Sequence, residues 1–413
     1  MREKTAVPQT SVTNLLHRHP LALMRVLGPG LIAGAADTDP TTVAVLAVVG
    51  ASTIYGLSWL VILVIPMLIV IQVVSATVGV VARGGLEDVV RSRYGRPLAL
   101  LILLCVLAVN ILTLAADLEG GSAALGLLTG LSFKWFILPF AVAVTALLIW
   151  GSYGGLQRIL RYVLLIFLAY IVTAFLARPH WGDVLHATVV PHFHFTSDYV
   201  GGALALLGTT LTSYAYVWET IEEAQERPPL RWLGLAQLDA GIGMVAAGII
   251  FWFIVIGTGA TLGVKGQQVQ TAQDAAQALT PLAGRFAADL FGIGLLASAI
   301  IAIPVLAGTS AYVIAEMFGW RASLDASFGR AKAFYGAVIL SMVAGVAITF
   351  LGVSPIRLLF IGSIAGGLAT PITLAILMVV ARDRKVMGEN RIRRGLTIAG
   401  WVVTAVITLA GGS

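Results

Sequence analysis

The chain has 413 residues, of which 58% are hydrophobic and 11% are charged, and its formal net charge is +6. Soluble globular domains carry about 25% charged residues, so this composition excludes an ordinary soluble domain. The apolar residues form continuous runs, several of which reach the length of about 20 residues that spans a bilayer as a helix. The composition therefore predicts an all-α integral membrane protein.

Eleven apolar segments are predicted along the chain, separated by short connectors. They lie at 27–52, 57–81, 97–125, 135–150, 156–176, 199–223, 232–262, 285–315, 333–351, 354–380 and 395–411. With the N-terminus placed in the cytoplasm, 21 of the 26 Lys and Arg residues fall in cytoplasmic connectors. An excess of Lys and Arg in cytoplasmic connectors is typical of helical membrane proteins, so this asymmetry favours a cytoplasmic N-terminus. Because topology explains the basic net charge, no nucleic-acid partner is predicted.

The first segment is interrupted by polar residues. Asp37 and Asp39 lie in its middle, and Pro40 follows Asp39 directly. Proline lacks an N–H and clashes with the preceding turn, so the helix is predicted to break here and to expose carbonyl oxygens. Carboxylates beside free carbonyls form an oxygen-rich ligand set of the kind that hard cations prefer. The alternative is a simple proline kink whose aspartates pair elsewhere, but no Lys or Arg lies in the middle of a predicted segment.

The third segment also contains ionisable residues, Asp117 and Glu119. Such residues at membrane depth are costly and indicate a functional role by default. They are candidates for an ion or proton relay. Hydrogen bonding to neighbouring helices is the alternative, and the sequence leaves both interpretations open.

The sixth segment has an interruption that corresponds to the one in the first. Gly208 weakens its helix, and four of the next five residues carry hydroxyl groups, namely Thr209, Thr210, Thr212 and Ser213, with Tyr214 after them. Segments one and six are the first helices of two predicted five-helix halves. Interrupted helices at matching positions of inverted repeats point to the substrate site of a transporter.

An acidic stripe follows this interruption. Glu219, Glu222 and Glu223 are spaced so that they lie on one helical face. We expect them to line a cytoplasmic vestibule and to raise the local cation concentration there. A solvated helix end is the alternative interpretation.

The sequence therefore predicts one membrane transport domain over residues 1–413. Its parts are a first repeat at 27–176, a second repeat at 199–380 and an extra C-terminal helix at 395–411. No H-E-x-x-H metal motif and no G-x-S-x-G nucleophile motif is present, so no enzymatic activity is predicted.

Several blocks of residues resemble the NRAMP family of divalent-metal transporters. The resemblance extends from about Gly28 to Gly388. The blocks are Gly28-Pro29-Gly30, Asp39-Pro40, Ala116-Asp117-Leu118, Gly208-Thr209-Thr210, Asp239 to Met244, Pro281 to Gly284, Ile303 to Tyr312, Phe318-Gly319-Trp320 and Met387-Gly388. The later blocks resemble a divergent bacterial branch that includes NRAMP-related magnesium transporters. This resemblance implies a LeuT-type bundle with broken helices 1 and 6, located in the bacterial inner (plasma) membrane.

The resemblance also implies a set of metal ligands. These would be the side chains of Asp39, Thr42 and Thr212 and the carbonyl oxygens of Ala36 and Thr209. The chain departs from the family motif Asp-Pro-Gly-Asn, because Thr41-Thr42 replaces Gly-Asn. It also departs from the family's Met-Pro-His, where it has Thr212-Ser213-Tyr214.

These departures bear on ion selectivity and coupling. Loss of the methionine removes the soft thioether ligand, which favours a hard cation such as Mg²⁺ or Mn²⁺. Loss of the histidine predicts transport without proton coupling, because a tyrosine does not titrate near neutral pH. The predicted function is transport of a hard divalent cation by alternating access, with no cofactor. The alternative is transport of a small organic solute, such as an amino acid, on the same fold. The lipid bilayer is the other expected partner, and the sequence predicts no oligomeric state.

Overall fold

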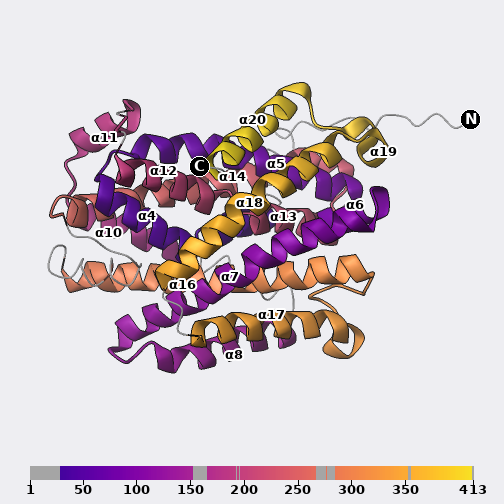
Figure 1. Ribbon diagram of the computed structural model, residues 1–413, viewed down its shortest axis with the longest axis horizontal. Helices are drawn as coiled ribbons and strands as arrows, with labels where there is room; N and C mark the ends of the chain where they lie inside the picture. The colour runs from indigo at the N-terminus through magenta and orange to yellow at the C-terminus, as the bar shows by residue number, and fades with distance from the viewer. Residues whose placement is uncertain are drawn as a thin grey trace, which may run out of the picture.

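The computed structural model describes residues 28–151, 165–191, 193–194, 196–266, 276, 284–351 and 355–411. These residues form helices joined by turns, with no β-strand in any of the described ranges (Figure 1). The predicted all-α class is therefore confirmed. Residues 1–27, which hold part of the predicted cytoplasmic charge, and residues 156–164 of the fifth predicted segment lie outside the described ranges.

The helices follow the predicted segments closely. Those before residue 190 are α3 (Pro29–Asp37), α4 (Pro40–Thr53), α5 (Ser58–Ala82), α6 (Leu86–Arg93), α7 (Arg96–Thr129), α8 (Lys134–Trp150), α10 (Leu168–Leu176) and α11 (Trp181–Val189). Those after it are α12 (Ser197–Thr210), α13 (Ser213–Glu226), α14 (Leu233–Thr258), α16 (Arg285–Phe318), α17 (Lys332–Phe350), α18 (Pro355–Arg382), α19 (Arg384–Met387) and α20 (Arg394–Gly411).

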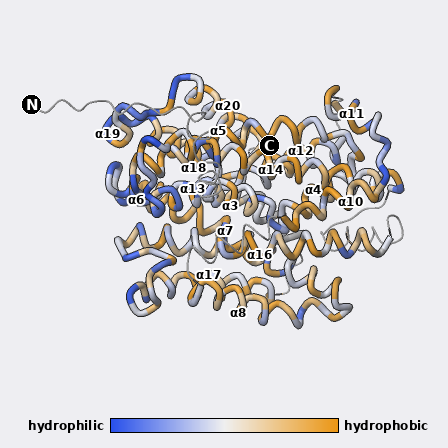
Figure 2. The backbone as a smooth tube through the Cα atoms, turned by 180° about the vertical axis from the view of Figure 1, so that it is seen from behind, coloured by the Kyte–Doolittle hydropathy of each residue, from blue (hydrophilic) through white to orange (hydrophobic). Residues whose placement is uncertain are grey.

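The described helices account for the eleven predicted membrane segments. Eight spans are long and apolar enough to cross a bilayer, and the number rises to ten if two bent helix pairs, α3 with α4 and α10 with α11, each count as one span. The shorter apolar helix α8 corresponds to the predicted segment at 135–150. Figure 2 shows the consequence for the whole molecule, since hydrophilic residues gather towards its ends and hydrophobic residues lie between them.

The long helices run roughly parallel to one another across the molecule. Helix α7 packs along α16, and α14 packs along both α5 and α3 (Figure 1). Helices α8 and α17 form an outer layer on one side, and α18 packs against α20 and α7. The short α6 and α19 lie at one end of the bundle and α11 lies at the other.

Both predicted helix interruptions are present. The axes of α3 and α4 differ in direction by 50° across Thr38 and Asp39. In the second predicted half, α12 ends at Thr210 and α13 begins at Ser213, with Leu211 and Thr212 between them. The boundaries of the two repeats stay a prediction.

The N-terminal half of the first span, α3, packs closely against α14. A Cβ atom on Gly34 would lie 2.3 Å from the carbonyl oxygen of Gly243, so both positions need glycine for the backbones to approach this closely. At the start of α3 the carboxylate of Asp239 accepts hydrogen bonds from Gly28 N at 3.1 Å and Gly30 N at 2.9 Å. These backbone donors have no partner within their own helix, so Asp239 caps α3 from a neighbouring helix.

Helix α6 closes the same end of the bundle. Leu86 N donates to the hydroxyl of Thr220 on α13 at 3.0 Å, and Asp88 N donates to the carboxylate of Glu316 on α16 at 3.2 Å. Glu87 is fully buried between these contacts. Burial, followed by the nearby Glu316 carboxylate, raises the pKa of Glu87 to about 9.

Candidate functional site

The carboxylate of Asp39 lies at the interruption of the first span. Asp39 is the N-cap of α4, and its Oδ1 accepts a hydrogen bond from Thr42 N at 2.6 Å. Pro40 occupies the first position of α4, where a missing N–H costs nothing. The unpaired N–H groups and the dipole at this helix start stabilise a negative charge, so the sequence itself fixes the carboxylate at the break.

Tyr214, in the first turn of α13, connects both broken helices. Its hydroxyl lies 2.8 Å from the carbonyl oxygen of Ala36 and 2.8 Å from Oδ2 of Asp39, and both contacts are hydrogen bonds with the tyrosine as donor. The side chain is fully buried. Because a hydroxyl has a single hydrogen, it donates to one of the two oxygens at a time. Tyr214 therefore ties α13 to the residues on both sides of the break in helix 1.

Three threonines complete the contacts between the two breaks. The hydroxyl of Thr42 lies 3.1 Å from the hydroxyl of Thr209 and 3.3 Å from the Thr209 carbonyl oxygen. Thr212 donates its hydroxyl to Oδ1 of Asp37 at 3.2 Å. In this conformation the Ala36 and Thr209 carbonyls thus accept hydrogen bonds from hydroxyl groups. The fold brings together the predicted ligand residues, which are Ala36, Asp39, Thr42, Thr209 and Thr212.

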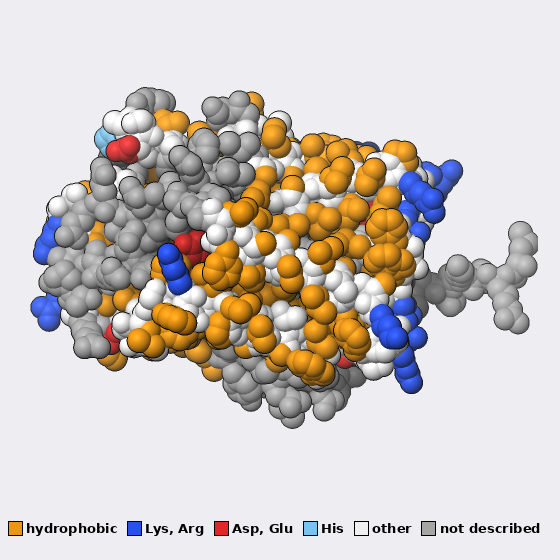
Figure 3. Space-filling view, turned by 60° about the horizontal axis from the view of Figure 1, so that its bottom comes forward, with side chains coloured by type: hydrophobic (Ala, Val, Ile, Leu, Met, Phe, Trp, Pro, Cys, Tyr) orange, Lys and Arg blue, Asp and Glu red, His pale blue; other side chains and the backbone are white. Residues whose placement is uncertain are grey.

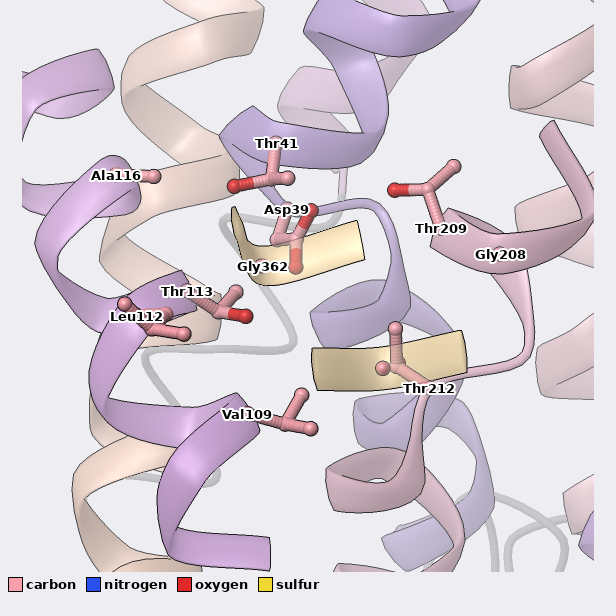
Figure 4. A pocket seen from close by; sticks show the side chains of 11 residues that line it. Asp39, Thr41, Val109, Leu112, Thr113, Ala116, Gly208, Thr209, Thr212 and Gly362 are labelled. Carbon is pink, nitrogen blue, oxygen red and sulfur yellow. The ribbon is translucent and has the colours of Figure 1, made fainter. Parts of the chain in front are cut away.

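A small cavity adjoins these residues. The volume open to the centre of a water molecule is about 30 Å³, which is room for a small cation or a water molecule. Figure 4 shows Asp39 at its centre, with the hydroxyl of Thr209 pointing towards it and Thr212 beneath it. Further lining comes from Thr41 on α4, from Gly208 on α12, from Val109, Leu112, Thr113 and Ala116 on α7, and from Gly362 and Gly366 on α18.

Two more carboxylates are buried near Asp39. Asp37, the last residue of α3, has no exposed surface, and neither does Asp117 on α7. Asp117 Oδ1 accepts hydrogen bonds from Thr41 N at 3.2 Å and from the Thr41 hydroxyl at 2.9 Å. Among the described residues, none of the three forms a salt bridge with Lys, Arg or His. Glu119, the other relay candidate, is half-buried on α7 and does not line the cavity.

The predicted acidic stripe is enclosed in this conformation. Glu219, Glu222 and Glu223 are between 0% and 2% exposed, so they do not border an open vestibule here. Glu219 accepts a hydrogen bond from the side-chain amide of Gln72 on α5 at 3.3 Å. Packing of α5 and α6 against α13 covers this face. Its role as a vestibule stays a prediction that concerns a conformation open at this end.

The polar groups of the site offer oxygen atoms as ligands. In the described ranges no group of three or more His, Cys, Asp and Glu side chains is arranged to hold a metal ion. The polar side chains that line the cavity carry one carboxylate and several hydroxyls. Such a sparse set suits a hard cation that keeps part of its water shell, because water supplies the remaining ligands.

Some residues that line the cavity at Asp39 were not predicted from the sequence. Thr113 and the two glycines of α18 carry no pattern that distinguishes them from ordinary membrane-helix residues. Thr41 was visible only as a departure from the family motif. Their positions depend on how α7 and α18 pack beside the broken helices, which no local signal reports.

Comparison with known sequences places the chain in a family. The profile described as "Natural resistance-associated macrophage protein-like" (Nramp) matches residues 30–412. A "Divalent metal cation transporter MntH" of Deinococcus radiodurans is 28% identical over 416 residues, which cover 94% of this chain and 89% of that protein. The MntH of Aeromonas hydrophila is 27% identical and is covered to 93%, as is this chain.

Solved structures show the same fold. A manganese transporter of Eremococcus coleocola, in complex with an aromatic bis-isothiourea substituted compound, matches with a TM-score of 0.79 at 18% identity. The match covers 96% of this chain and 87% of that one. MhsT in complex with L-phenylalanine matches with a TM-score of 0.61 at 16% identity, over 92% and 96% of the two chains. The LeuT-type fold is thus confirmed, and with a family profile that covers nearly the whole sequence, the chain belongs to the Nramp family.

Proposed function

We propose that this protein transports a divalent metal cation across a membrane and binds it at Asp39. The observation that carries the proposal is a buried carboxylate at a helix break that forms no salt bridge within the described ranges and lies beside a small cavity lined partly by hydroxyl groups. An ionised carboxylate in such surroundings costs several kcal/mol unless a cation compensates it. The relatives named as divalent metal cation transporters and the manganese transporter of the same fold support this reading.

The ion is a hard one, Mg²⁺ or Mn²⁺. Asp39, the threonine hydroxyls and the carbonyls of Ala36 and Thr209 offer only oxygen, and the position of the family's methionine is taken by Thr212. Mg²⁺ binds one or two carboxylates and retains several waters, which agrees with a site that has few protein ligands. The Ala36 carbonyl becomes available to the ion once the Tyr214 hydroxyl leaves it.

The membrane orientation follows from the basic residues. Arg93 of α6 forms an ion pair with Asp383, beside α19, at 2.8 Å, so the arginines of both helices share one end of the molecule. Figure 3 shows a broad hydrophobic band, with more Lys and Arg side chains at its right-hand end than at its left-hand end. The positive-inside rule assigns that end to the cytoplasm of a bacterial inner membrane, and by the same rule the basic residues before residue 28 favour a cytoplasmic N-terminus. Alternating access then exposes Asp39 to each side in turn.

Transport proceeds without proton coupling. Tyr214 replaces the family's histidine, and a phenol, unlike an imidazole, does not ordinarily exchange its proton near physiological pH. Metal uptake into proteoliposomes is therefore expected to leave the internal pH unchanged, as reported by a trapped pH-sensitive dye. Acidification in proportion to the metal taken up would contradict this and would point to Asp117 or Glu119 as the proton carrier.

An organic solute is the second candidate, because MhsT, solved with L-phenylalanine, shares the fold. Two features oppose it. The cavity of about 30 Å³ has no room for an amino acid, and the Asp39 carboxylate repels a solute carboxylate.

Calorimetric titration of the purified protein with Mg²⁺, Mn²⁺, Ca²⁺ and L-phenylalanine tests the proposal. We expect heat of binding with Mg²⁺ or Mn²⁺ and none with the amino acid. The Asp39→Asn protein, which keeps the shape of the side chain, is expected to show no metal binding. Amino-acid binding by the wild-type protein, or undiminished metal binding by Asp39→Asn, would overturn the proposal.

A further inference from the structure

Asp37 is a buried carboxylate that the site at Asp39 leaves unused. It has no exposed surface, and its Oδ1 accepts the hydrogen bond from the Thr212 hydroxyl. Its Oδ2 is buried and has no hydrogen-bond partner among the described residues. A buried carboxylate oxygen that lacks a donor costs free energy in this conformation, so a ligand is needed to offset that cost when the group is ionised.

The cavity reaches Asp37 through Thr212. Thr212 lines the cavity beside Asp39 and donates its hydroxyl to Asp37. The cavity itself is lined by Asp39 and Thr212 at the two breaks and by residues of α4, α7, α12 and α18, but by none of α3. Asp37 ends α3, which lies between α4 and the end of the bundle formed by α6 and α19 (Figure 2). It is therefore the next carboxylate beyond Asp39 in the direction of α3 and α13.

The side chains of Tyr214 and Thr212 close this direction by hydrogen bonds. Tyr214 joins α13 to Ala36 and Asp39, and Thr212, at the start of α13, joins it to Asp37. Any movement of α13 away from α3 breaks both connections. Such a movement frees the Ala36 carbonyl and Oδ1 of Asp37, so that both carboxylate oxygens of Asp37 are then open to a ligand.

We propose that Asp37, with the Thr212 hydroxyl, forms a second cation position, which the ion occupies when it leaves Asp39 towards the end formed by α3 and α13. This inference rests on the proposed function. A second carboxylate on the exit path replaces the charge that the ion loses on leaving Asp39, and a divalent ion in a low-dielectric site needs that compensation most. Waters and the hydroxyl of Thr212 complete the ligand set of a hard cation.

A purely electrostatic role for Asp37 makes a different prediction. In that case Asp37 would only make the potential at Asp39 more negative, as Asp117 does from the opposite side. Asp117 is equally buried, and it too has one oxygen, Oδ2, without a partner among the described residues. Its hydrogen bonds go to Thr41 on the cavity side, so it lies off the proposed exit path. Asp117→Asn is therefore the matched control for Asp37→Asn.

The experiment compares binding with turnover. Mn²⁺ affinity is measured by calorimetry and initial Mn²⁺ uptake by proteoliposomes at saturating metal, for the wild type, Asp37→Asn, Asp117→Asn and Asp39→Asn. Asparagine keeps an oxygen that accepts the Thr212 hydrogen bond. We expect Asp37→Asn and Asp117→Asn to weaken Mn²⁺ binding by a similar, few-fold factor. The turnover at saturating Mn²⁺ is expected to be roughly ten-fold or more lower in Asp37→Asn than in Asp117→Asn.

The outcomes separate the two proposals. Equal turnover of Asp37→Asn and Asp117→Asn overturns the second cation position and leaves the site at Asp39 intact. Metal binding by Asp39→Asn overturns the proposed function itself. Should Asp37→Asn fail to fold, Asp37→Glu decides, because it keeps the charge. It is expected to restore turnover to within about three-fold of the wild type, and a folded, Mn²⁺-binding but inactive Asp37→Glu protein counts against the inference.

Discussion

The two sides of the helix breaks differ in packing and in chemistry. On the side of α4 and α12 lies a cavity lined by hydroxyl groups and glycines. The side of α3 and α13, here called the packed side, encloses the acids Asp37, Glu219 and Glu222, and the cavity that borders α3 there is lined almost entirely by apolar residues. Asp39 lies between the two sides and contacts both, through Thr42 on one and Tyr214 on the other.

This difference shows what alternating access requires of the sequence. Enclosed carboxylates are costly, so the packed side is stabilised by close backbone contacts and by caps such as Asp239 on α3. When that side opens, water reaches the same carboxylates and they become an acidic path for a cation. The same carboxylates thus belong to a closed and an open conformation of this side, and the structure has this side closed.

The largest expected effect comes from the residue between the two sides. Asp39→Asn removes the charge and keeps the volume, so we expect Mn²⁺ uptake into proteoliposomes to fall at least about 100-fold while the protein remains folded. Asp198→Asn, at an exposed aspartate in the first turn of α12, is the control and is expected to transport normally. Equal loss in both variants would show that the effect is not specific to the break.

Glycine substitutions test the packing difference directly. Gly34→Ala on the packed side places a Cβ 2.3 Å from the Gly243 carbonyl oxygen, so overpacking is expected to cost about 1–3 kcal/mol of stability. Gly208→Ala on the cavity side meets nothing within 4 Å, and the better helix propensity of alanine is expected to add up to about 1 kcal/mol. Thermal unfolding in detergent measures both. A loss of stability in Gly208→Ala would mean that the cavity side is as tightly packed as the other.

Selectivity is tested at Thr212, which borders both sides. Thr212→Met replaces a hydroxyl by a soft thioether and removes the hydrogen bond to Asp37. We expect Cd²⁺ to gain over Mg²⁺ by about 1.4 kcal/mol, a ten-fold change in relative affinity that competition binding resolves. Thr212→Val, which removes the hydroxyl without adding sulfur, is the control. An unchanged Cd²⁺ to Mg²⁺ preference in Thr212→Met would show that this side chain does not face the ion.

The last comparison concerns the pH dependence of stability on the packed side. The pKa of Glu87 is raised from its ordinary 4.5 to about 9, so between these values the folded protein holds a proton that the unfolded chain has released. Stability therefore falls as pH rises through this window, by up to about 1.4 kcal/mol per pH unit for this group. We expect the unfolding temperature of Glu87→Gln to change less than that of the wild type between about pH 5.5 and 8.5.

A matched control separates this group from the other acids. Glu389→Gln changes an exposed glutamate near α19 and is expected to follow the wild-type profile. If Glu87→Gln also follows the wild-type profile, then Glu87 does not hold its proton in the folded protein, and the closure of this end by α6 does not depend on pH.

Most of the fold was predictable because the signals for it are local. The lengths of the apolar runs predicted the eleven membrane segments, and Pro40 after Asp39 predicted the first helix break, where Asp39 is the cap. The second break was indicated by Gly208 and the hydroxyl run and is present at Leu211 and Thr212. The short helices α6 and α11 and the cap from Asp239 to α3 were not predicted, since each depends on contacts between distant residues.

The sequence by itself determined the class of the protein, the positions of its breaks and the oxygen chemistry of its site, because composition and helix-breaking residues act locally. The tertiary structure decided which oxygens are free. Only the packing of α13 against α3 shows that Tyr214 contacts Ala36 and Asp39, that Thr212 contacts Asp37, and that the glutamates of α13 are enclosed. Burial and hydrogen bonding depend on partners from distant parts of the chain, and no pattern along a single helix specifies those partners.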